Sequence, residues 1–127
     1  HTLNPAMLLQ NGKPALVYGT MGGEGQPQTQ AALVTRIVDY GMSVQAAIEA
    51  PRWLYGRTWG ASSNTLKLES RIAHDIRLAL AEKGHDIEVL ADFTDTMGHA
   101  GAIWIDPDTN VKFGGADPRG DGVAIGY

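Results

Sequence analysis

The chain has 127 residues, of which 43% are hydrophobic, and this is enough to form one domain with its own core. Ten basic and fourteen acidic residues give a net charge of −4, and the basic residues are scattered. A nucleic-acid partner is not expected, because neutralising phosphates requires a clustered basic surface. No membrane partner is expected either, since no apolar run approaches the roughly 18 residues of a membrane-spanning helix.

The sequence contains no cysteine, which excludes disulfides, thiolate metal sites and a cysteine nucleophile. The first residue is histidine rather than methionine, and no signal peptide is recognised. We therefore expect a processed product or a fragment whose targeting signals would lie upstream, and the sequence assigns no compartment.

Two apolar runs near the start of the chain predict a β-hairpin. They span Ala6–Gln10 and Ala15–Gly19 and flank the pair Asn11-Gly12. Asn-Gly favours a two-residue hairpin turn, because both central positions of that turn need a positive φ.

Helical spacing follows a glycine-rich turn. Leu33, Ile37 and Tyr40 recur along one face and predict a helix from about Pro27 to Tyr40, ended by Gly41.

The middle of the chain predicts a mixture of elements. Ser43 is placed to cap a second, shorter helix that Pro51 ends. Residues 51–65 are rich in glycine, serine and aromatics and have no period, which favours a loop or a set of short strands. Residues 65–70 alternate as a strand does.

The last third of the chain predicts a helix and three strands. A helical pattern begins at Ile72 and is stopped by Gly84, and a strand follows from Asp86 to Leu90. Residues 101–119 predict a second hairpin with its turn at Pro107 to Asn110.

These elements, six strands and three helices in the order ββααβαβββ, predict a single α/β layered (α+β) domain over residues 1–127. Hairpins at both ends favour an antiparallel or mixed sheet with helices on one face.

The glycine turn Met21-Gly22-Gly23 allows two interpretations. Its backbone amides could stabilise a developing negative oxygen, as in an oxyanion hole, or its glycines could serve only the geometry of a tight turn. A phosphate-binding loop is disfavoured, since no GK[ST] ending is present and Glu24 would place a negative charge beside the phosphate.

Other candidate residues are weaker. The histidines have no mutual metal-ligand spacing, so no metal site is expected; they are His1, His74, His85 and His99. We expect His74 and His85 at the surface, and a structural role for His99 in preference to a place in a cleft.

No convincing nucleophile is present. No G-x-S-x-G serine elbow occurs, and the Ser62-Ser63 pair has no obvious partner. For Asp117 and Arg119 we favour an ion pair that pins a turn.

Seven segments in order nevertheless resemble the C-terminal part of the gamma-glutamyltransferases (gamma-glutamyltranspeptidases) and their relatives. They are NP at Asn4-Pro5, LLQNGKPALVYGT, MGGEGQPQ, DYGMSVQAAIEAPR, LESR, LAEKGHDIEVL and GGADPRGDGVAIGY. The resemblance covers almost the whole chain.

This resemblance implies an N-terminal nucleophile hydrolase fold, a four-layer αββα sandwich, with no cofactor. In such enzymes a precursor cuts itself into two subunits, and the new N-terminal threonine of the small subunit attacks the γ-amide of glutathione or a similar donor. Water or an amino acid then resolves the acyl-enzyme.

The resemblance also implies roles for particular residues. Gly22 and Gly23 fall on the oxyanion-hole glycine pair. His1 and Thr2 fall where transpeptidases commonly have two serines that bind the α-carboxylate of the donor. Because histidine replaces the first serine, the chain is more similar to the acylases and amidohydrolases of the family, whose donors differ.

The nucleophilic threonine of the family would lie upstream of residue 1. The resemblance therefore implies a C-terminal fragment of a small subunit, inactive alone, whose partners are the rest of the enzyme. A non-catalytic binding or assembly module is the alternative. An uncovered sheet face would favour self-association.

Overall fold

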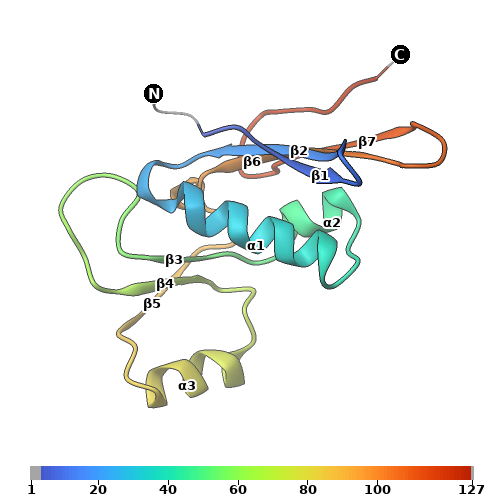
Figure 1. Cartoon of the computed structure of the whole chain (residues 1–127). Helices are drawn as coiled ribbons and strands as arrows, with labels where there is room; N and C mark the ends of the chain where they lie inside the picture. The colour runs from blue at the N-terminus through green and yellow to red at the C-terminus, as the bar shows by residue number, and fades with distance from the viewer. Residues whose placement is uncertain (1–3, 127) are drawn as a thin grey trace.

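A computed structural model describes residues 4–126 (Figure 1). The strands of this part of the chain are β1 (Ala6–Gln10), β2 (Lys13–Met21), β3 (Trp53–Tyr55), β4 (Leu66–Glu69), β5 (Ile87–Leu90), β6 (His99–Ile105) and β7 (Lys112–Ala116). Its α-helices are α1 (Gln26–Val38), α2 (Val44–Glu49) and α3 (His74–Glu82), and its short 3-10 helices are η1 (Gly23–Gly25) and η2 (Asp95–Met97).

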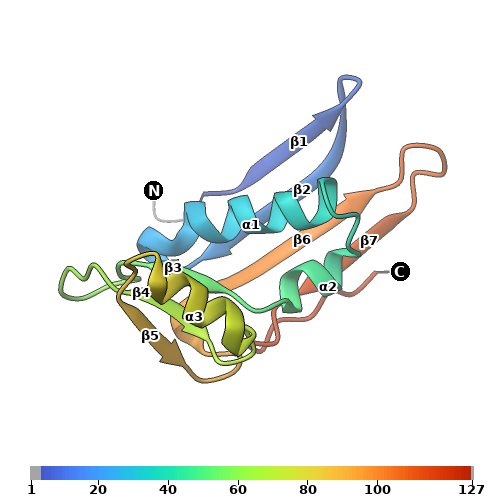
Figure 2. The same cartoon turned by 90° about the horizontal axis from the view of Figure 1, so that it is seen from below.

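The two predicted hairpins form one antiparallel sheet of four strands, in the order β1-β2-β6-β7. In Figure 2 these strands lie side by side behind α1 and α2. The first hairpin turn is confirmed, with φ of 53° at Asn11 and 76° at Gly12. The pairing of β2 with β6 brings the segment after residue 98 beside the glycine turn, although the two are far apart in the sequence.

The helices α1 and α2 confirm the predicted elements. Gly41 follows α1 with a φ of 64°, as a residue beyond a helix C-terminus often does. The Ser43 side chain accepts a hydrogen bond from the Ala46 amide at 3.4 Å and so caps α2.

A second sheet has the strand order β3-β4-β5. Its β4 and β5 strands are parallel and connected through α3, whereas the other strand pairs are antiparallel, so the arrangement is mixed, which is one of the two that the sequence favoured. The predicted tally of six strands was wrong by one, because β3 lies inside the region without a period. The Gln28 side chain pairs with the main chain of Tyr55 on this strand, a tertiary contact that no local pattern reports.

The elements are arranged in layers, with the four-stranded sheet, α1 and α2, the three-stranded sheet, and α3 following one another (Figure 1). The core between the first two layers consists of Leu16, Leu33, Ile37, Val44, Ala47, Ile48, Ala100 and Ala102. The predicted α/β layered class is correct.

The other face of the four-stranded sheet carries exposed apolar side chains. Met7 pairs with Val17, and Val17 pairs with Ile103, so a row of apolar residues crosses three strands. Met7 and Ile103 are 54% and 42% exposed. Residues 120–126 border a cavity of about 890 Å³ on this face. We call this face the outer face. Within residues 4–126, no helix combines the length and apolar character needed to cross a membrane.

Candidate active site

The glycine turn joins the end of β2 to η1 and α1, and its geometry requires glycine. Gly22 and Gly23 have φ values of 142° and 50°. A Cβ atom on Gly23 would overlap the carbonyl oxygen of Thr58, and one on Gly22 would lie 3.1 Å from the Cα of Gly98. The backbones of two other loops therefore pack directly on this turn.

Among residues 4–126, no hydrogen bond uses the N–H of Gly22 or Gly23, whereas the Gly22 carbonyl accepts one from the Gly25 amide at 2.9 Å. Gly22 and Gly23 lead through η1 into the N-terminal end of α1, where the helix dipole favours negative charge. The tight-turn and oxyanion-hole interpretations are thus compatible. Close packing explains why residues 22 and 23 are glycines, and it leaves their N–H groups without a hydrogen bond in the described part of the chain.

The segment after β3 holds the glycine turn in place through contacts with Glu24. The Glu24 amide donates to the Thr58 carbonyl at 3.4 Å, and the Arg57 guanidinium lies 2.8 Å from the Glu24 carboxylate. The hydrogen bond from Arg57 lowers the pKa of Glu24, so the carboxylate is ionised and paired. The negative charge that disfavoured phosphate binding is therefore balanced by Arg57.

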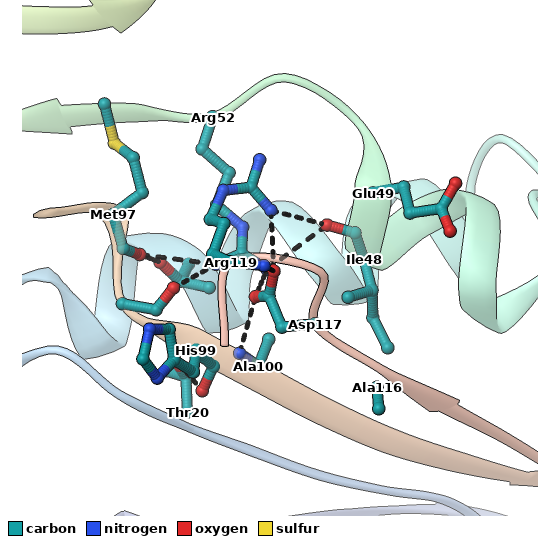
Figure 3. A network of polar contacts seen from close by, with 12 residues as sticks. Thr20, Ile48, Glu49, Arg52, Met97, His99, Ala100, Ala116, Asp117 and Arg119 are labelled. Carbon is teal, nitrogen blue, oxygen red and sulfur yellow. Dashed lines mark hydrogen bonds and ion pairs between the residues drawn. The ribbon is translucent and has the colours of Figure 1, made fainter. Parts of the chain in front are cut away.

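Five charged side chains form a mostly buried network, and Figure 3 shows three of them, Arg52, Asp117 and Arg119. Arg52 contacts Asp117 at 2.5 Å, and Asp117 contacts Arg119 at 2.9 Å. Arg119 contacts Glu69 at 2.6 Å, and Glu69 contacts Arg71 at 2.7 Å. We call these five residues the charge network. The favoured Asp117–Arg119 ion pair is confirmed, but as one link of a larger assembly.

The charges of the network depend on one another. Burial disfavours ionisation of Asp117, but Arg52, the amides of Ala100 and Arg119, and the Arg119 charge outweigh it, so its pKa lies below the usual value. Burial lowers the pKa of Arg52 to about 10, against the opposing effect of Asp117. At neutral pH both groups therefore carry their charge.

Sequence reasoning missed Arg52 and Glu69. Their positions fall within the quoted segments ending in APR and LESR, but their partner residues are remote: 65 positions separate Arg52 from Asp117, and 50 separate Glu69 from Arg119. No spacing rule for helices or strands reports such contacts.

The histidines and Thr2, the other residues singled out in the sequence, differ in where they lie. His74 and His85 are exposed, as expected. His99 is half-buried, borders the cavity and packs its ring near Gly120, so it lies in a cleft as well as contributing to packing. His1 and Thr2 lie outside the described residues.

Ser63, for which no partner was foreseen, contacts Thr65 at 2.8 Å and Lys67 at 3.3 Å. Over residues 4–126, no three His, Asp or Glu side chains are grouped so as to hold a metal ion.

Comparison with known proteins establishes the family. The family model of gamma-glutamyltranspeptidase matches residues 1–127, the whole sequence. The chain belongs to the gamma-glutamyltranspeptidase family. The resemblance found in the seven segments is thereby confirmed.

Two curated relatives are more than half identical to this family member. The oxamate amidohydrolase proenzyme of Klebsiella pneumoniae is 56% identical over 127 residues, 100% of this chain and 24% of the relative. The glutathione hydrolase-like YwrD proenzyme of Bacillus subtilis is 52% identical over 126 residues, 99% of this chain and 24% of the relative. The chain thus spans about a quarter of the length of these relatives.

A solved structure supports the fold. The cephalosporin acylase from Bacillus halodurans superposes with a TM-score of 0.83 and 36% identity, covering 97% of this chain and 22% of the acylase. The mixed α/β architecture is therefore one found in this family of transpeptidases and acylases.

Proposed function

We propose that the chain is the C-terminal part of the small subunit of a gamma-glutamyltransferase-like N-terminal nucleophile hydrolase, and that it supplies the oxyanion hole. The observation that carries this proposal is the pair of unused amides at Gly22 and Gly23, at the positive end of α1. The family match over the whole chain supports it.

The chemistry divides between this chain and the segment upstream. The hydroxyl oxygen of an upstream N-terminal threonine attacks the carbonyl carbon of the donor amide, and its α-amino group takes the proton. The carbonyl oxygen becomes negative and accepts hydrogen bonds from the Gly22 and Gly23 amides. The carbon–nitrogen bond then breaks, the amine leaves with a proton, and water or an amino acid releases the acyl group.

The donor is a γ-glutamyl compound such as glutathione or a different small amide. The two relatives, an oxamate amidohydrolase and a glutathione hydrolase-like proenzyme, support one candidate donor each. His1 and Thr2 are the proposed carboxylate-binding residues for either donor.

We also propose that the outer face stacks against a second sheet from the rest of the enzyme, completing a four-layer αββα sandwich. The exposed apolar row from Met7 to Ile103 supports this arrangement, because burying it against another sheet removes apolar surface from water.

The test is mass spectrometry of the full-length protein mixed with each donor. A γ-glutamyl mass from glutathione, or an oxalyl mass left after oxamate loses ammonia, added to the small-subunit N-terminal threonine supports the proposal and names the donor. Full-length protein that turns over neither donor and acquires no adduct favours a non-catalytic module. The 127-residue chain alone is expected to be inactive, and its robust turnover of a γ-glutamyl anilide would contradict the proposal.

A further inference from the structure

The loop from residue 91 to residue 98 connects the charge network to the glycine turn. It leaves β5, passes through η2 and ends at Gly98. Gly98 has a φ of 73°, and a Cβ atom there would overlap the carbonyl oxygen of Met21. The loop is therefore the surface on which Gly22 rests, and displacing it would displace the Gly22 amide.

Arg52 holds the C-terminal end of this loop. Its Nη1 donates to the carbonyls of Met97 at 3.3 Å and Gly98 at 3.0 Å. Its Nη2 donates to Ile48 at 3.2 Å and to the Asp117 carboxylate at 2.5 Å (Figure 3). The side chain is 3% exposed, so water does not compete effectively for these bonds.

The charge network also holds the start of the loop. The Arg71 guanidinium lies 3.7 Å from the centre of the Phe93 ring, and that of Arg119 lies 5.4 Å away. Both arginines are paired with Glu69. Phe93 has a φ of 51°, which is unfavourable for an aromatic residue, so its conformation depends on these contacts.

We propose that Arg52 is a positioning residue for the Gly22 and Gly23 amides. It acts through the Met97 and Gly98 carbonyls, and Asp117 fixes its guanidinium in turn. The inference rests on the proposed oxyanion role of the amides. A shift of about 1 Å in a catalytic group can lower the rate about 100-fold, so the loop must be held closely.

The test uses the full-length protein with Arg52→Lys. Lysine keeps a positive charge near Asp117 but lacks the planar fork that reaches three carbonyls and a carboxylate together. We expect kcat to fall about 10- to 100-fold while KM changes less than about twofold. The matched control is Arg36→Lys, because Arg36 also donates to two backbone carbonyls, those of Ala47 and Pro51, which lie outside the loop.

Hydrogen exchange of the peptide containing residues 20–26 gives a readout that needs no turnover. We expect faster exchange in Arg52→Lys than in wild type or Arg36→Lys. Phe93→Leu, at a 39% exposed position, should increase the exchange rate of the same peptide by a smaller amount. If Arg52→Lys does not fold, this variant provides the test of the inference.

The outcomes separate the two proposals. Faster exchange with unchanged kcat keeps Arg52 as a positioning residue and rejects the oxyanion role of the glycines. Unchanged exchange at residues 20–26 overturns the inference, even if the melting temperature falls, since Arg52 would then serve stability alone. Equal effects of Arg52→Lys and Arg36→Lys on kcat and exchange also overturn it.

Discussion

Gly22 and Gly98 pack closely against each other: a Cβ on either residue would lie 3.1 Å from the Cα of the other. This contact joins the end of β2 to the start of β6 at the point where the candidate oxyanion amides emerge. The pair therefore links the fold of the four-stranded sheet to the geometry of the candidate site.

Gly98→Ala should destabilise the protein more than an ordinary glycine replacement. Alanine at a φ of 73° is strained, and its Cβ would also overlap the Met21 carbonyl. Gly41→Ala is the matched control, since Gly41 has a φ of 64° but no atom within 4 Å of the new Cβ. In urea unfolding, we expect Gly98→Ala to cost about 1–3 kcal/mol more than Gly41→Ala. Equal costs of the two replacements would show that position 98 tolerates a side chain.

Glu69→Gln should be strongly destabilising. The replacement removes the carboxylate that Arg71 and Arg119 share and leaves Arg119 with Asp117 alone, and removing one partner of a buried pair typically costs about 3–5 kcal/mol. Glu88→Gln is the control, because Glu88 pairs with Lys67 but is 48% exposed, and its loss should cost less than about 1 kcal/mol. Urea unfolding of both variants measures the difference, and similar costs would contradict a buried network.

Asp117 should make the folding stability of the chain depend on pH in the acidic range. Its pKa is lower in the folded chain than in the unfolded one, so the unfolded chain binds its proton first as the pH falls. The stabilisation is complete above the unfolded pKa and is lost progressively below about pH 4. Asp117→Asn should lower stability at pH 7 and flatten its fall in acid, whereas Asp108→Asn, in an exposed turn, should leave the profile unchanged. Thermal melts from pH 7 to pH 2 measure this, and an Asp117→Asn profile parallel to wild type would rule it out.

The outer face should make the isolated 127-residue chain self-associate. Ile103 is 42% exposed in the apolar row, and replacing it with lysine should weaken association in sedimentation velocity. Ile76→Lys, at a 52% exposed position on α3, is the control and should have little effect. A monodisperse wild-type monomer that binds no hydrophobic dye would argue against an uncovered face.

Local signals predicted much of the fold. The Asn11-Gly12 turn and the Ser43 cap depend on φ angles and on side chains within three residues, and both were correct. The strand β3 was not separately predicted, because its pairing depends on β4 and on the Gln28 side chain rather than on its own pattern.

The candidate site was only half predictable. The sequence drew attention to Gly22 and Gly23, but it could not decide between steric and chemical reasons for them. The structure shows the steric partners, Thr58 and Gly98, which are remote in sequence. Arg52 was missed for the same reason, since its role depends on a loop that folds back from β5.

The most direct test of the central claim is a crystal structure of the full-length protein with a tetrahedral mimic, such as a boronic acid, bound to the nucleophile. We expect one oxygen of the mimic to lie about 2.7–3.1 Å from the amide nitrogens of both Gly22 and Gly23. An oxygen that contacts neither amide and is held by other donors would contradict it.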